Sequence, residues 1–272
     1  MKAAIIAPTT LLSRYATGDY HLCLAHLVNS DKQYADFYRT RANAGDHVIL
    51  DNSVIELGQP MFFSDLQRAI DKIHPVEFVL ADFPREPTAT LHWAEEYGFT
   101  LKGLYPEMKL MAVPQWTKQK LPSEWLYNYN QLEELSCIDS IGIPKFLGKH
   151  RTMVCEELSH MRNPKWEHHL LGTWGNPIEV KDLAEQFDWL RGVDSKAPVR
   201  AGLAGVAFHP EFGLLANRDA LPPMNFAEAF DPMPIITWSN IKQFLGWAEG
   251  RTEAQVLALR KEFIIGAESS SR

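Results

Sequence analysis

Eight short apolar runs recur along the chain, separated by segments with helical periodicity or loop character. Near-continuous apolar runs of about five residues are typical of parallel strands buried on both faces. Their repeated alternation with helices predicts an α/β fold, a (β/α)8 TIM barrel. The predicted strands cover residues 2–7, 21–28, 47–51, 78–82, 109–114, 140–144, 168–173 and 192–195.

Most connections between these strands carry helix signals. In "SDLQRAIDKIH", Ser64 and Gln67 form a predicted capping box at the start of a helix. Leu66, Ile70 and Ile73 share one face of the same helix. The first connection, residues 8–20, is predicted to be a loop. Further helices are predicted at residues 32–43, 88–97, 123–136, 150–161 and 178–190.

The pattern changes after about residue 200. Residues 200–234 are rich in Gly, Pro and Asn and are predicted to form a long surface loop. One helix from Ser239 to about Glu249 would close the barrel, and a second from Thr252 to about Phe263 would pack outside it. The predicted organisation is a barrel over residues 1–250 that includes the loop, followed by a C-terminal helix and tail at 251–272.

The composition favours a globular protein outside the membrane. The 272 residues are 46% hydrophobic, with 8 Trp and 14 Phe, which allows a sizeable core. No window reaches the roughly 18 apolar residues of a membrane span, and the apolar start is too short for a secretory signal. We therefore expect a cytoplasmic location and no membrane partner.

The three cysteines argue against a disulfide framework or a cysteine-based zinc site. Cys23, Cys137 and Cys155 are odd in number, widely spaced and form no CxxC pair. Cys23 and Cys155 lie in apolar surroundings and are predicted to be small core residues.

The net charge of −7 argues against a protein that coats nucleic acid without sequence preference. The net charge is still compatible with a local basic groove. Two runs concentrate positive charge, "KFLGKHR" at residues 145–151 and "SKAPVR" at 195–200. For either run taken alone, solvated helix starts and loops are the favoured reading.

Polar residues follow several of the predicted strands. Asp51, Asp82 and Asp194 end the third, fourth and eighth strands, Gln115 ends the fifth, and Gly142 lies in the sixth. Active sites of TIM barrels lie at the carboxyl ends of the strands, so these side chains are expected to converge. Any single Asp here could instead cap a helix or a loop. Periodicity alone thus predicts a barrel enzyme with a carboxylate site and no particular substrate.

A resemblance to a known family also predicts a substrate. Read in order over residues 48–200, the strand ends resemble those of the tRNA-guanine transglycosylase family. The first motif looks most like the phage-encoded branch that exchanges guanine in DNA for a 7-deazaguanine. The family's "LLDSGGFQ" is matched by "ILDNSVIE", "LDEC" by "LADFPR", "VQG" by "VPQ", "YLMGVGTP" by "HLLGTWGNP", and "FDCVLPTR" by "VDSKAPVR".

The resemblance implies a double displacement on the sugar, with retention of configuration. It makes Asp194 the nucleophile and Asp51 the general acid/base, without a cofactor. The implied partners are guanine-containing DNA and a free 7-deazaguanine base, in a host cytoplasm if the protein is phage-encoded. The implied substrate-binding residues are Asp82, Gln115 and the Gly142 backbone at the guanine edge, Asn52 and Gly172 in the matched motifs, and Lys196 and Arg200 as phosphate contacts.

The chain also departs from the family pattern. The tRNA enzymes carry a CxCxxC…H zinc site after the last barrel strand, and no cysteine follows Asp194 here. We therefore expect no zinc subdomain and no metal. Ser53-Val54 replaces the Gly-Gly after the first Asp, and "HLLGTWGNP" contains one extra residue.

Three other readings stay open at this point. The protein could act on RNA, as the tRNA enzymes of the family that it resembles do. It could be a barrel lyase or aldolase that uses Lys145 or Lys196 as a Schiff base, or a metal. His168 and His169 could contribute to a metal site, although at most one of two adjacent strand residues faces inward. A barrel without activity could also serve as a binding module.

Overall fold

The computed structural model describes residues 1–117, 122–227, 229–251 and 255. Eight parallel strands form one sheet in the order β1-β8-β7-β6-β5-β4-β3-β2 and alternate with helices, which is the arrangement of a (β/α)8 TIM barrel. The predicted fold class is confirmed. The strands are β1 (Lys2–Ile5), β2 (Tyr20–Leu24), β3 (His47–Asp51), β4 (Glu77–Val79), β5 (Lys109–Ala112), β6 (Ser140–Pro144), β7 (Glu167–Leu171) and β8 (Leu190–Ser195).

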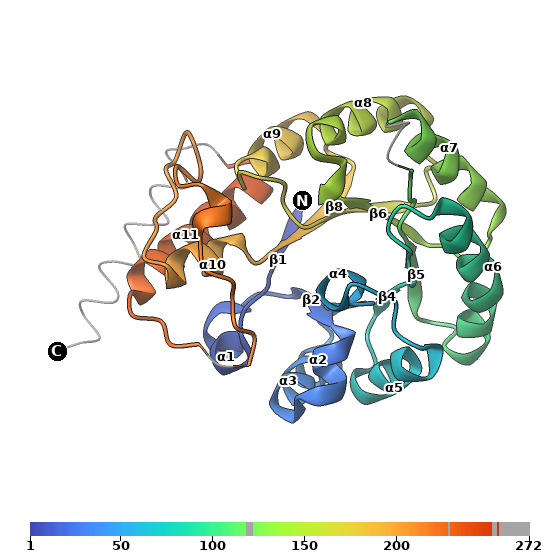
Figure 1. The fold of residues 1–272 in the computed structure, drawn as a ribbon, viewed down its shortest axis with the longest axis horizontal. Coiled ribbons are helices and arrows are strands. Elements are labelled where there is room, and N and C mark those ends of the chain that lie inside the picture. Colours follow the sequence, from blue (N-terminus) through green and yellow to red (C-terminus); the bar gives the residue numbers. More distant parts are fainter. Residues whose placement is uncertain (118–121, 228, 252–254, 256–272) are drawn as a thin grey trace. The chain divides into compact units, whose positions relative to one another are not determined.

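Contacts divide the chain into two compact units, Met1–Thr17 with Gly172–Arg272, and Gly18–Leu171. The unit Gly18–Leu171 contains β2 to β7, and its larger helices lie on the outer side of these strands (Figure 1). Its helices are α2 (Ala25–Ser30), α3 (Lys32–Asn43), α4 (Val54–Leu57), α5 (Phe63–Ile73), α6 (Pro87–Leu104), α7 (Ser123–Gln131) and α8 (Arg151–Met161), with 3-10 turns η2 (Leu132–Glu134) and η3 (Lys145–His150).

Alternation along the strands separates the two faces of the sheet in this unit. In β2, the ring of His21 contacts Phe37 and Tyr38 of α3, so this side chain faces the helices. The preceding residue, Tyr20, points the other way, and its hydroxyl lies 2.8 Å from Nδ1 of His169 in β7. Because β2 and β7 are not neighbours in the sheet, this contact crosses the inner side of the strands.

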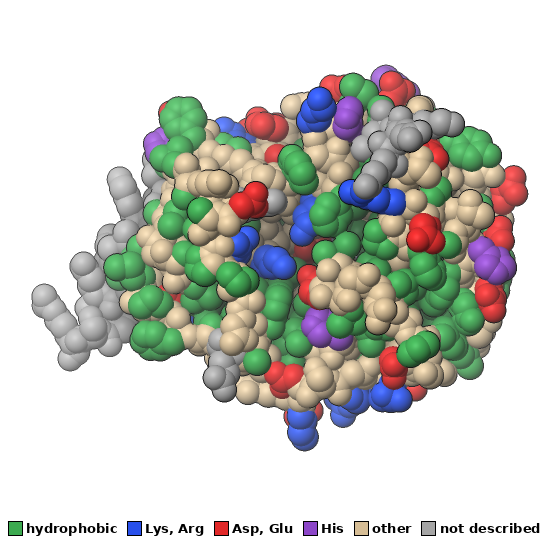
Figure 2. Space-filling model, viewed as in Figure 1, with side chains coloured by type: hydrophobic (Ala, Val, Ile, Leu, Met, Phe, Trp, Pro, Cys, Tyr) green, Lys and Arg blue, Asp and Glu red, His purple; other side chains and the backbone are tan. Residues whose placement is uncertain are grey.

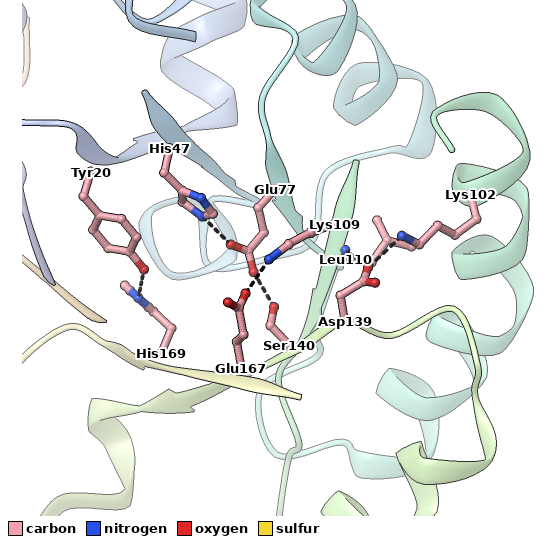
Figure 3. A network of polar contacts seen from close by, with 10 residues as sticks. All are labelled: Tyr20, His47, Glu77, Lys102, Lys109, Leu110, Asp139, Ser140, Glu167 and His169. Atoms are coloured by element: carbon pink, nitrogen blue, oxygen red, sulfur yellow. Dashed lines mark hydrogen bonds and ion pairs between the residues drawn. The ribbon is translucent and has the colours of Figure 1, made fainter. Parts of the chain in front are cut away.

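The first residues of β2 to β7 form what we call the amino-end polar layer: Tyr20, His47, Glu77, Lys109, Ser140 and Glu167. Figure 3 shows their side chains turned toward one another. Glu77 is fully buried; its Oε2 lies 2.8 Å from Nε2 of His47, and Ser140 donates to its Oε1. Lys109 Nζ lies 2.6 Å from Glu167 Oε2. Buried carboxylates are tolerated when they are paired in this way.

Replacing His47 with alanine should therefore cost stability, because the buried Glu77 carboxylate would lose a hydrogen-bond partner. We expect the free energy of unfolding to fall by about 2–4 kcal/mol, measured by urea denaturation. The matched control is His92→Ala, which removes an exposed imidazole 3.8 Å from Glu96. It should change stability by less than about 0.5 kcal/mol. Equal losses of unfolding free energy in the two variants would contradict a stabilising role of the amino-end polar layer.

The unit Met1–Thr17 with Gly172–Arg272 is organised around α10 (Ala197–Leu203) and α11 (Pro234–Ala248). A Cβ atom on Gly202 of α10 would come within 2.6 Å of three atoms of Thr237 in α11, so glycine permits this close approach. Asn240 of α11 accepts from the backbone of Phe208 at 2.8 Å and donates to Val206 at 2.8 Å. The unit also contains η1 (Thr9–Leu11), α1 (Leu12–Tyr15), α9 (Glu179–Gln186) and η4 (Arg218–Ala220).

Several element boundaries differ from the sequence predictions. The predicted capping box is wrong, since α5 begins at Phe63 after an N-cap at Phe62 that makes no side-chain cap bond. The predicted strand 21–28 ends at Leu24, because an apolar run alone does not distinguish a strand from a buried helix such as α2. The predicted loop 8–20 contains η1 and α1.

At the C-terminal end, α11 starts five residues before the predicted Ser239, with Pro234 at a position that suits its fixed φ. The helix predicted from Thr252 to Phe263 falls almost entirely outside the described residues. Cys23 and Cys155 are buried, as predicted. Among the helices that the structure describes, none is long and apolar enough to cross a membrane.

Candidate functional site

Three predicted site residues meet in the unit Gly18–Leu171. Asp82 is 6% exposed and lies three residues after β4. Asn52 donates to its Oδ1 at 2.8 Å, and Gln115 donates to its Oδ2 at 2.7 Å. Because Asn52 follows β3 and Gln115 follows β5, three neighbouring strands supply what we call the Asp82 cluster (Asn52, Asp82 and Gln115).

The two amides of the Asp82 cluster are themselves held by the backbone. Asn52 also donates to the carbonyl of Leu80 at 2.7 Å and accepts from the Val54 N–H at 2.9 Å. Oε1 of Gln115 accepts from the N–H of Arg85 at 3.2 Å. The amide nitrogens are thereby directed at the carboxylate, which leaves Asp82 as the acceptor at the centre of the cluster.

Burial raises the pKa of Asp82 from its ordinary 3.8 to about 6, and the hydrogen bond from Asn52 opposes part of this rise. A carboxyl with a raised folded-state pKa binds its proton more tightly when folded. The contribution of Asp82 to the free energy of unfolding is therefore fully present below about pH 4 and is lost as the pH rises through about 6.

The Asp82→Asn variant should lack this pH dependence, since an amide does not titrate. Between pH 4 and 7 the wild-type protein should lose about 2–3 kcal/mol of unfolding free energy relative to the variant. Urea denaturation of both proteins at a series of pH values would measure the difference. Parallel profiles for the two proteins would contradict the raised pKa.

Asp51 is the last residue of β3 and is half-buried. Its Oδ1 accepts from the N–H of Ser53 at 2.7 Å. Ser53 has a φ of 64°, in the left-handed region, and precedes α4. The carboxylate thus stabilises a sharp turn between strand and helix, a conformation that a serine rarely adopts.

Gly142 lies in the middle of β6 and is enclosed by side chains. A Cβ atom there would meet Leu171 Cδ1 at 2.5 Å and Val113 Cγ2 at 3.1 Å. Packing therefore accounts for the glycine. Recognition of guanine by its backbone stays a prediction.

Asp194 lies in β8, within the other unit, and is 6% exposed. The N–H of Gly172, the first residue after β7, donates to its Oδ1 at 2.9 Å. Gly172 has a φ of 66°, which favours glycine. The hydroxyls of Thr173 and Ser195 lie 3.1 Å apart, so two contacts join residues 172 and 173 to β8.

The two predicted phosphate-contacting residues follow Asp194. Nζ of Lys196 lies 5.5 Å from the ring centroid of Phe226, within cation–π range. Arg200 donates through Nε to the carbonyl of Pro222 at 2.8 Å and through a terminal nitrogen to that of Leu221. The structure thus gives Arg200 a role in holding the long loop, and its phosphate contact stays a prediction.

Sequence reasoning missed the residues that support Gln115. Arg85 donates its N–H to Gln115 from a left-handed conformation with φ 72°, and Asn128 of α7 donates to the Gln115 carbonyl at 3.0 Å. Non-glycine residues with positive φ concentrate at functional sites. No periodicity marks either position in the sequence.

The two adjacent histidines of β7 point in opposite directions, as predicted. His169 lies against Tyr20 on the inner side, and Nε2 of His168 lies 3.1 Å from the hydroxyl of Tyr129 in α7. Within the part of the chain that the structure describes, no group of three or more His, Cys, Asp or Glu side chains could hold a metal ion.

Comparison with known proteins does not assign a family. No protein-family model matches the sequence, and no curated protein matches it. The function is therefore inferred from the side chains at the strand ends and from the motif resemblance.

Proposed function

We propose that this protein exchanges a guanine base in DNA for a 7-deazaguanine derivative, through a covalent intermediate on Asp194. The observation that carries the proposal is the Asp82 cluster, a buried carboxylate held by two amides at the ends of three strands. A carboxylate accepts hydrogen bonds from the N1–H and the exocyclic amine of guanine, and a glutamine amide can both donate and accept. The motif resemblance supplies the roles of Asp51 and Asp194.

The proposed reaction has two displacements at C1′ of the nucleotide. In the first, an Asp194 oxygen forms a bond to C1′ while the bond from C1′ to N9 of guanine breaks. The departing base keeps the electron pair and takes a proton from Asp51. In the second, Asp51 removes a proton from the incoming 7-deazaguanine, whose nitrogen bonds to C1′ as the ester bond to Asp194 breaks. No oxidant, reductant or cofactor is needed.

DNA is favoured over folded tRNA on electrostatic grounds. Folded tRNA presents a large negatively charged surface, and a protein of net charge −7 is poorly suited to bind it. Acidic, basic and hydrophobic side chains are interspersed on the face drawn in Figure 2. A short strand from which one guanine is turned out of the stack needs few phosphate contacts, which is in keeping with the two short basic runs at residues 145–151 and 195–200.

Labelled guanine tests the proposal directly. The protein is incubated with labelled guanine and either a guanine-containing DNA oligonucleotide or tRNA, and the label in each polymer is counted. We expect label and a trapped covalent adduct on the DNA, and little on the tRNA. Equal or stronger labelling of tRNA would overturn the DNA assignment and leave base exchange standing. Absence of label from both would overturn base exchange.

Activity is expected to survive EDTA, because both displacements use carboxylates alone and no cysteine cluster follows Asp194. Exchange rates before and after chelation should agree within about twofold, and metal analysis of the purified protein should find less than one equivalent of zinc. A loss of activity that added zinc restores would contradict the metal-free mechanism.

A further inference from the structure

A pocket of about 330 Å³ lies in the unit that contains Asp194. We call it the Trp174 pocket. Its volume is at the lower end of the range for small-molecule sites, which suits a single planar ring system. One wall is the turn after β7, and the other is the segment that leads into η4. The lining includes Trp174, Asn176, Leu214, Asn217 and Asp219.

Side-chain contacts hold the two walls of the Trp174 pocket together. Asn176 donates to the carbonyl of Phe212 at 2.5 Å and accepts from the N–H of Leu214 at 2.9 Å. Gly213 has a φ of 66°, and a Cβ atom there would lie 2.1 Å from Oδ1 of Asn176. The close approach thus requires glycine at this position, and the pocket is formed before any ligand arrives.

The Trp174 pocket adjoins the chain segment that holds Asp194. Trp174 is two residues beyond Gly172, whose N–H donates to Asp194 at 2.9 Å. Thr173, between them, contacts Ser195, the residue after Asp194. A nucleotide attacked by Asp194 would therefore have its neighbour in the strand close to this turn.

Trp174 has the properties of a stacking platform. The side chain is 44% exposed although tryptophan is a large apolar residue, and it borders the pocket directly. Bases of single-stranded nucleic acid stack on such rings. Asn217 and Asp219 add an amide and a carboxylate, groups that can hydrogen-bond the edge of a base.

We infer that the Trp174 pocket receives a nucleobase adjacent to the exchanged guanine, with its face stacked on Trp174. The inference rests on the proposed function and extends it, because it assigns a second base-binding position and thereby a source of sequence context. The extra residue in "HLLGTWGNP" falls in the segment that forms this wall.

The test pairs a protein change with a DNA change. Binding of labelled single-stranded DNA containing one guanine is measured by fluorescence anisotropy, with an abasic site placed in turn at each flanking position. For the wild-type protein, one flanking abasic site should weaken binding by about 5- to 100-fold. Trp174→Ala should cause a similar loss on intact DNA, and the same abasic site should then add little.

Two variants serve as controls. Trp174→Phe keeps an aromatic face and should retain most of the affinity. Phe230→Ala removes an aromatic side chain that is 85% exposed in the same unit, and should bind as the wild type does. Thermal unfolding of Trp174→Ala should match the wild type, since its side chain is partly in solvent.

DNA binding by Trp174→Ala that equals wild-type binding would overturn the inference. A loss of affinity at every abasic position that adds in full to the loss caused by Trp174→Ala would also overturn it. Guanine exchange is measured on the same oligonucleotides to separate the two claims. If the wild type exchanges guanine but shows no position-specific dependence on Trp174, the inference alone fails. If it exchanges none, the proposed function fails, and the abasic scan still reports whether a base stacks on Trp174.

Discussion

Replacing Asp194 with alanine is expected to lower the rate of base exchange by about 10⁴-fold or more. Without the carboxylate there is no nucleophile to form the glycosyl intermediate, so both displacements are lost together. The rate of label incorporation into DNA measures the effect. The covalent adduct, isolated on a denaturing gel, should disappear from the same samples.

The fold should survive this change, and a companion variant separates chemistry from structure. Asp194→Asn keeps an oxygen that can accept from the Gly172 N–H, and it should be as inactive as Asp194→Ala. Asp188→Ala alters an exposed carboxylate in the same unit and should be fully active. DNA binding should persist in all three. Near-normal turnover by Asp194→Asn would remove Asp194 from the mechanism.

The second large effect is expected for Asp51→Asn, with a loss of about 10²- to 10⁴-fold in exchange rate. An amide cannot donate and then recover a proton, so the departing guanine would leave without protonation. The substitution is chosen because an Asn oxygen can still accept from the Ser53 N–H, which preserves the turn before α4.

A readout specific to proton transfer distinguishes this role from a structural one. The wild-type pH–rate profile should lose one limb in Asp51→Asn, whereas a positioning role would lower the rate equally at every pH. Glu56→Gln makes the same carboxylate-to-amide change at an exposed position nearby and should leave the profile intact. An unaltered profile in Asp51→Asn would assign proton transfer to another group.

Much of the architecture was predictable because strand and site signals are local. The strands β3 and β6 have the predicted bounds, and the polar residues after β3, β4 and β5 were candidates from their positions alone. That Asn52 and Gln115 meet on Asp82 follows from the order of parallel neighbours. Local sequence patterns and the order of the strands were sufficient to predict these parts of the fold and of the candidate site.

Other features depend on contacts between distant segments. The pairing of Glu77 with His47 and Ser140 joins strand starts up to 93 residues apart, counting from 47 to 140. The tie from Asn176 to the segment around Gly213 forms only when the loop after α10 folds back. Neither set of contacts produces a periodic sequence pattern, because each involves single polar residues whose partners are set by tertiary structure.

Main-chain groups orient three of the candidate side chains. The Gly172 N–H holds Asp194, the Arg85 N–H holds Gln115, and the Leu80 carbonyl holds Asn52. Every residue type carries a carbonyl, and every type except proline carries an N–H. Residue 80 can therefore change identity during divergence without loss of its contact, whereas the left-handed conformations at Arg85 and Gly172 restrict the choice of residue at these two positions. Distant relatives are better sought by the spacing of strand-end polar residues than by overall identity.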